Sequence, residues 1–345
     1  MSVVVCVCVC ACVCVLHLHT HLFLRRAGLL CLFMGLTRLP NAETHTHAHT
    51  RTHTHAHTSA CVPRPALPLF PIQHAGECLR PHVPAVVRTF LTAMSAFESA
   101  KLSYLQQHAD GNSGMHDIGM TGEELEQRRV SAASGSVFGE VLDKCVQQIT
   151  GDNIAGTCDE VKGTLKSGLG LPTRAGAARF LVSLVNTVGV AMRDHCGALL
   201  KTLGNGLKHP SVTVRSEYGK AAAYLCRVAK NGAVKKYVAR LHAMVAEADS
   251  SDADARKTAG RAMCALVHHA GDKVKRYMVE IMPLVFLAMH DPEEEVADVW
   301  RDAWTSLAPS PAHSMRLYLK EIVRARCVGC VVAVAVVVVA LRRAR

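Results

Sequence analysis

The chain has 345 residues, of which 50% are hydrophobic but only 5% are aromatic. This composition favours an alanine-, valine- and leucine-rich helical protein over a β-sandwich, in which aromatic and β-branched residues are enriched. The formal net charge of +11 suggests nucleic-acid binding at first sight. However, the segment from Ser131 to Val323 holds 24 of the 39 basic and 20 of the 28 acidic residues, a net charge of +4. Most of the excess positive charge therefore lies outside this segment, and we expect no nucleic-acid partner.

Residues 1–91 have low sequence complexity. Residues 3–15 read VVVCVCVCACVCV and residues 44–58 read THTHAHTRTHTHAHT. A GT dinucleotide repeat encodes Val-Cys and its complement encodes Thr-His, so the two tracts indicate translated simple-repeat DNA or an erroneous gene model. Six prolines between Ser59 and Pro84 mark a linker, because each proline removes a backbone donor and restricts its neighbour. We expect residues 1–91 to be disordered or an artefact.

Both ends also permit functional interpretations, which we favour less. A signal sequence at Ser2–Val15 lacks a preceding basic region and a clear cleavage site. Nine histidines lie between residues 17 and 57, but no spacing among them fixes four ligands around a metal. The tail, residues 324–345, contains the apolar run Cys327–Leu341, which as a helix would span about 22 Å. That is short of the roughly 30 Å of a bilayer core, so a membrane anchor is the weaker alternative.

A repeat of 41 residues organises the middle of the chain. Arg174, Arg215 and Arg256 are separated by this distance, and a further step reaches Ala297. Positions 3, 7 and 10 after each of these residues lie on one face of a helix and are apolar in all four units. Position 10 is a leucine in every unit, and we expect equivalent burial of Leu184, Leu225, Leu266 and Leu307.

Each unit continues with a second helical pattern. Its apolar position 22 is occupied by Cys196, Tyr237, Met278 and Leu319, and the pattern ends near Arg326. Two helices in about 40 residues are typical of HEAT repeats, which bury their apolar faces by stacking. We predict an all-α, HEAT/ARM-type α-solenoid of stacked antiparallel helix pairs over residues 92–323, with disordered or low-complexity ends. An ordinary helical bundle is the alternative.

Two features superficially suggest chemistry. Cys264 and His268 stand at i and i+4 on one helical face, but a buried cysteine beside a helix-terminal histidine explains them better. The glycine-rich stretch Ser167–Gly176 lacks the Gly-Lys-Ser/Thr ending of a phosphate-binding loop and indicates a turn between helices. We therefore expect no enzyme, no metal site, no cofactor and no small-molecule substrate.

Two basic clusters repeat at about the same spacing. If they align along the stack, they would form a ridge for an acidic partner. A plain solvated face is the alternative. The candidate ridge consists of Lys235, Lys236, Lys273, Lys275 and Arg276.

Several segments resemble a known family. They are SGLGLPTRAGAARFLVSL (Ser167–Leu184), PLVFLAMHDPEEE (Pro283–Glu295), VWRDAW (Val299–Trp304) and MRLYLKEIV (Met315–Val323). Together with fainter matches they resemble the proteasome adapter and scaffold family, large HEAT-repeat proteins that bind the 26S proteasome. The similarity extends from about Thr92 to Val323.

The resemblance implies a non-catalytic scaffold that binds the 26S proteasome and supports its assembly, quality control or localisation. It also implies a cytoplasmic and nuclear location. The family contributes no catalytic residues. Alternatives are a generic HEAT adaptor, such as a transport receptor or cytoskeletal scaffold, or a membrane-anchored or metal-binding protein acting through its tails.

Overall fold

The structure is a computed structural model that describes residues 76–96, 121–248 and 252–326. The expectations about the Val-Cys and Thr-His tracts and about the apolar run of the tail lie outside the described residues. The chain divides into two compact units, residues 1–82 and 83–345. In the first unit the structure describes a short 3-10 helix, η2 (Gly76–His82).

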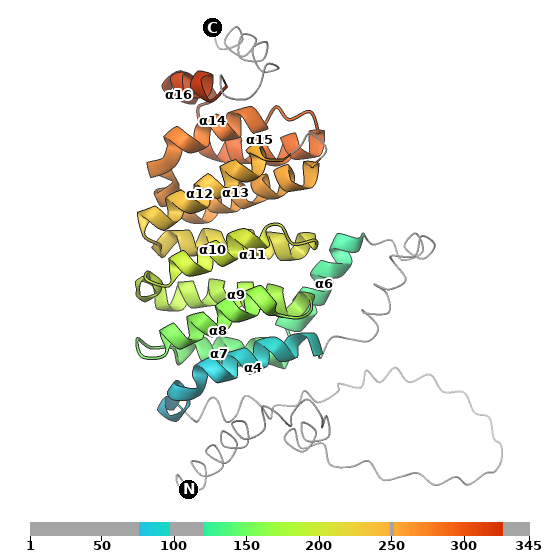
Figure 1. Ribbon diagram of the computed structural model, residues 1–345, viewed down its shortest axis with the longest axis vertical. Coiled ribbons are helices and arrows are strands. Elements are labelled where there is room, and N and C mark those ends of the chain that lie inside the picture. Colours follow the sequence, from blue (N-terminus) through green and yellow to red (C-terminus); the bar gives the residue numbers. More distant parts are fainter. Residues whose placement is uncertain (1–75, 97–120, 249–251, 327–345) are drawn as a thin grey trace, which may run out of the picture. The chain divides into compact units, whose positions relative to one another are not determined.

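Within the described ranges of the second unit every regular element is a helix and no strand occurs, so the predicted all-α solenoid fold is confirmed (Figure 1). The α-helices are α4 (Val83–Ala96), α6 (Gly122–Ser134), α7 (Val137–Gln147), α8 (Ile154–Ser167), α9 (Leu171–Val188), α10 (Cys196–Gly206), α11 (Val212–Val228), α12 (Asn231–Ala246), α13 (Ala253–Val274), α14 (Met278–Ala288), α15 (Glu294–Leu307) and α16 (Pro311–Arg326). Two 3-10 helices, η3 (Gly189–Met192) and η4 (Lys275–Tyr277), precede α10 and α14.

The first helices of the four sequence units form one row. In it α9 packs on α11, α11 on α13 and α13 on α15. The second helices lie on the other side, where α10 packs closely on α11, α12 on α13 and α14 on α15. Each second helix is therefore the close partner of the first helix of the next unit. The 41-residue period is retained, but the packed pairs are shifted by one helix from the units of the sequence.

The apolar positions of the repeat form the core of this row. Leu184, Leu225 and Leu266 are fully buried, as predicted. The fourth member, Leu307, is only half-buried, so the prediction of equivalent burial is wrong at this position. The physical reason is that α15 ends at this leucine, ahead of Pro309, and is the last member of its row among the described helices.

The helical part begins earlier than the expected boundary at residue 92. Helix α4 starts at Val83, with Pro84 in its first turn, where the missing backbone N–H is tolerated. Its buried residues Val87, Leu91 and Met94 share one helical face, and the helix packs on α7, α8 and α9. At the other end α16 continues to Arg326, three residues past the expected limit. The second unit thus contains helices from 83 to 326.

One helical stretch, Leu171–Met192, is long and apolar enough to cross a membrane by length and composition alone. It comprises α9 and η3. Half of its most apolar window is buried inside the protein, and Phe180, Leu181 and Leu184 are core residues. A core helix of a stacked-helix protein passes the same test.

Close approach of α10 and α11 depends on Gly206. A Cβ atom there would lie 2.2 Å from two ring carbons of Tyr218. The ring cannot retreat, because it is fully buried and its hydroxyl donates a hydrogen bond to the Leu165 carbonyl at 2.9 Å. We expect Gly206→Ala to lower the free energy of unfolding by about 1–3 kcal/mol, as overpacking does. Urea unfolding followed by circular dichroism measures this.

The matched control is Gly163→Ala in the interior of α8. A Cβ atom at this position meets nothing within 4 Å. Because alanine is the better helix former by about 0.5–1 kcal/mol, the control should keep or raise stability. Equal effects of the two substitutions would contradict the close packing of α10 on α11.

Candidate protein-interaction surfaces

The three repeat arginines lie in the first turns of α9, α11 and α13. The guanidinium of Arg174 donates hydrogen bonds to the carbonyls of Gly168 at 2.8 Å and Lys166 at 3.3 Å, at the C-terminal end of α8. Helix ends leave carbonyls without intrahelical partners, and a cation is favourable there. Arg174 therefore stabilises the turn that precedes its own helix.

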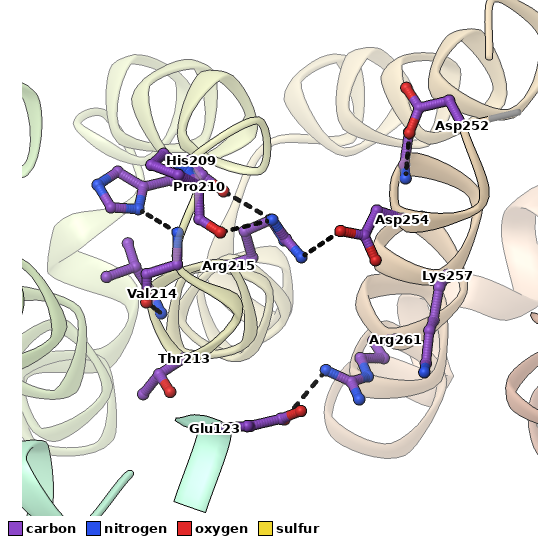
Figure 2. A network of polar contacts seen from close by, with 12 residues as sticks. Glu123, His209, Pro210, Thr213, Val214, Arg215, Asp252, Asp254, Lys257 and Arg261 are labelled. Atoms are coloured by element: carbon purple, nitrogen blue, oxygen red, sulfur yellow. Dashed lines mark hydrogen bonds and ion pairs between the residues drawn. The ribbon is translucent and has the colours of Figure 1, made fainter. Parts of the chain in front are cut away.

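Arg215 makes the equivalent contacts one unit later. Its Nη1 donates to the carbonyls of His209 at 2.9 Å and Pro210 at 3.0 Å, and its Nη2 lies 3.6 Å from the Asp254 carboxylate of α13 (Figure 2). Arg256 pairs through two nitrogens with Asp291, at 2.7 and 3.1 Å. The side chains of this pair are only 9% and 8% exposed. These arginines thus connect units of the stack, which leaves them little surface to offer a partner.

The predicted basic ridge is accessible at four of its five positions. Lys235, Lys236, Lys275 and Arg276 are exposed, at the start of α12 and in η4. Lys273 is half-buried, and its ammonium donates to the Ala229 carbonyl at 3.4 Å. Lys275 forms a 3.0 Å ion pair with Asp272, in which both side chains are largely exposed. Use of the ridge by a partner stays a prediction.

A second basic set was missed at the level of sequence. Arg179, Lys220 and Arg261 stand five residues after the repeat arginines, again 41 residues apart, on α9, α11 and α13. The same register that located the core leucines would have located them. Lys220 is exposed, while Arg179 and Arg261 make polar contacts described below.

The residues that suggested chemistry do not form a reactive site. The Cys264 thiol donates to the Val299 carbonyl at 3.2 Å, whereas His268 Nε2 lies 3.0 Å from the Ser306 hydroxyl. Burial raises the pKa of the Cys264 thiol to about 12, so it is protonated at neutral pH and a poor nucleophile. In the part of the chain that the structure describes, no group of three or more His, Cys, Asp or Glu residues is placed to hold a metal ion.

The remaining buried thiols and the glycine-rich stretch are structural. Burial raises the pKa of Cys145 and Cys158 to about 12 and that of Cys196 to about 11. The glycine-rich stretch joins α8 to α9, and Gly170 adopts a φ of 82°, a left-handed conformation that glycine adopts without strain. The interpretation of this stretch as a turn between helices is confirmed for residues 168–170, whereas residues 171–176 form the first turns of α9.

Stacked helix pairs of 41-residue period, joined by arginine contacts between units, define a HEAT-repeat scaffold. Residues 79–246 match the HEAT-repeat domain of the family described as "Proteasome adapter and scaffold protein ECM29". The proteasome adapter and scaffold protein ECM29 of Homo sapiens is 26% identical over 267 residues, which cover 72% of this chain. The proteasome-associated protein ECM29 homolog of Drosophila melanogaster is 25% identical over 73% of the chain, and the proteasome component ECM29 of Saccharomyces cerevisiae 21% over 75%.

The chain is therefore similar to the proteasome adapter and scaffold proteins, and its residues 79–246 match the HEAT-repeat domain of that family. It spans 13% of the length of each of these three relatives. The family resemblance of the repeat segments is thereby confirmed.

Proposed function

We propose that this chain is part of a longer protein, here called the full-length product. We propose that the full-length product is a non-catalytic adaptor that binds the 26S proteasome. Its role is to support the assembly, quality control or localisation of proteasomes in the cytoplasm and nucleus. The observation that carries the proposal is the match of the repeat region to relatives that are named proteasome adapters and scaffolds. The stacked helix pairs support it, because such a stack offers an extended protein-binding surface.

The length of the chain sets an expectation for its affinity. It spans 13% of its relatives' length, and stable interfaces usually bury about 1,200–2,000 Å². A surface distributed along a long stack loses contact area when most of the stack is missing. We therefore expect the full-length product to hold proteasomes tightly and the 345-residue chain alone to hold them weakly or not at all.

Affinity purification from cells tests the proposal. The full-length product carries a terminal tag, and an unrelated HEAT-repeat protein of similar length and expression is the control. Quantitative mass spectrometry should find both 20S and 19S subunits enriched with the product but not with the control. Enrichment of other partners without proteasome subunits would instead indicate a generic HEAT adaptor, such as a transport receptor or cytoskeletal scaffold.

The basic ridge is the surface of this chain that we propose for an acidic segment of the partner. Lys235 and Arg276 occupy the same position of consecutive units, 41 residues apart, and both are exposed. In the same purification Lys235→Glu/Arg276→Glu should reduce recovery of proteasome subunits. Lys201→Glu/Lys208→Glu, which changes the charge equally at two exposed lysines of α10 and the turn that follows it, is the matched control. Equal recovery from both variants would remove the ridge from the proposal.

A further inference from the structure

Helix α6 lies across the row of first helices. Going backward along α6, Ser134 accepts a hydrogen bond from Arg179 of α9 at 3.0 Å, and Glu126 accepts one from the Ser211 hydroxyl before α11 at 2.6 Å. Glu123, near the start of α6, pairs with Arg261 of α13 at 3.2 Å (Figure 2). A helix of 13 residues is about 20 Å long, which matches two steps of about 8–10 Å between packed helices. One short helix therefore reaches three successive units.

The attachment of α6 is mostly polar. Two of its residues, Leu125 and Val130, are buried, whereas most other core helices bury five or more. In the ion pair between α6 and α13, the side chain of Arg261 is 33% exposed and that of Glu123 is 52% exposed. An ion pair this exposed contributes little to stability. The helix also has its own capping box, in which Thr121 and Glu124 bond reciprocally, so its start does not depend on the row. These features place α6 among the elements that open most easily.

The row of first helices has a basic residue at one repeat position in three consecutive units, namely Arg179, Lys220 and Arg261, and these form a basic face. Helix α6 contacts Arg179, Arg261 and the N-terminal end of α11, which carries positive partial charge, whereas Lys220 is exposed. Glu217 neutralises part of the charge of Arg179 through contacts of 2.9 and 2.6 Å. In the fourth unit the equivalent position is Asp302, so the basic face ends at α13.

We propose that this face is a docking surface for an acidic helix of a partner protein, and that α6 covers it as a removable internal ligand. The contacts of α6 define the chemistry of the partner helix. Glu123 and Glu126 of α6 are three residues apart on one side of the helix and face Arg261 and the start of α11. A partner with carboxylates at the same spacing makes the same contacts. The proposal does not depend on whether the repeat region binds the 26S proteasome.

Competition with α6 makes binding conditional. Because only two residues join α6 to α7, the effective concentration of α6 at the face is in the millimolar range or above. An external helix binds only those molecules in which α6 has left the face. Its apparent dissociation constant is therefore inversely proportional to the fraction of such open molecules. Weakening α6 must therefore strengthen the binding of an external acidic helix.

The experiment uses the full 345-residue chain and a fluorescein-labelled synthetic peptide of the sequence Thr121–Ser134. Fluorescence anisotropy measures peptide binding in 0.05 M NaCl. The variant Glu123→Gln/Glu126→Gln removes the charge-assisted contacts of α6 in the chain but leaves the peptide unchanged. We expect this variant to bind the peptide about tenfold more tightly than the unaltered chain, as the open fraction increases.

A third substitution locates the binding face. Adding Arg261→Glu to the variant should abolish the gain, whereas adding Lys201→Glu, the same charge change at an exposed residue of α10, should preserve it. The proposal is overturned if the gain is absent in a variant whose circular dichroism spectrum is unchanged. It is also overturned if Lys201→Glu acts like Arg261→Glu, because attraction would then reflect net charge alone.

Hydrogen–deuterium exchange of the unaltered chain tests whether α6 opens easily, and this test does not require any variant to fold. The amides of α6 should exchange at least tenfold faster than those of α11. Their exchange should accelerate further between 0.05 M and 0.5 M NaCl, since salt screens exposed ion pairs. Protection of α6 equal to that of α11 at both salt concentrations would exclude a removable helix.

Discussion

Replacing Leu225 by alanine should lower the free energy of unfolding by about 2–5 kcal/mol, the usual range for a buried leucine. Leu225 is fully buried in α11, which packs on both α9 and α13. The substitution therefore leaves a cavity between two interfaces of the row, and neighbours on either side can collapse into it only partly. Urea unfolding followed by circular dichroism gives the difference from the unaltered chain.

Leu307 provides a matched control at the same position of the repeat. It is half-buried at the end of α15, so its side chain already contacts solvent and its removal leaves no closed cavity. We expect Leu307→Ala to cost only about 1 kcal/mol, because the three carbon atoms it removes are half-buried and full burial of each would contribute about 0.8 kcal/mol. A loss of the same size at both positions would show that repeat position alone, and not the neighbouring helices, determines burial.

Removal of the Asp291 carboxylate should have a comparable effect. Asp291→Ala removes the carboxylate that faces the buried charge of Arg256, and breaking a buried pair typically costs about 3–5 kcal/mol. We expect a loss near 3 kcal/mol, because the pair lies in a turn region. Asp291 also accepts a hydrogen bond from the Glu293 amide at 3.0 Å, so the turn before α15 should loosen as well. The same urea experiment measures this loss.

The control for this prediction is Asp272→Ala, which removes one partner of an exposed ion pair with Lys275. It should give no measurable loss, because solvent replaces the contact. A second arm exchanges both buried partners, as Arg256→Met/Asp291→Leu, and should recover part of the stability lost in Asp291→Ala. A fully stable Asp291→Ala protein would mean that the pair does not join the third and fourth units.

The period of the apolar residues was sufficient to predict the core of the row. Leu184, Leu225 and Leu266 are buried because residues 41 apart occupy equivalent places in a stack of equal units. The same pattern could not predict the exposure of Leu307, which depends on where α15 ends and on the absence of a further described helix in its row. Periodicity also could not predict which neighbouring helices pair most closely. A second helix that packs on the first helix of its own unit and one that packs on the first helix of the next unit give the same sequence pattern.

The polar contacts were less predictable than the core. The repeat of Arg174, Arg215 and Arg256 was visible, but their partners differ from unit to unit, since the turns between units differ in sequence. The placement of α6 was not predictable at all. Its buried residues are few and its contacts reach residues up to 138 positions away, so no local pattern records them.

The most direct test of the proposed adaptor function uses purified components. Full-length product and purified 26S proteasomes are mixed at increasing concentration and separated on a native gel, with the 345-residue chain titrated in parallel. We expect the full-length product to shift 26S particles in a saturable manner and the shorter chain to shift them weakly or not at all. No shift by a folded full-length product, with proteasomes that remain intact and active, would contradict the account and leave a HEAT-repeat scaffold for a different partner.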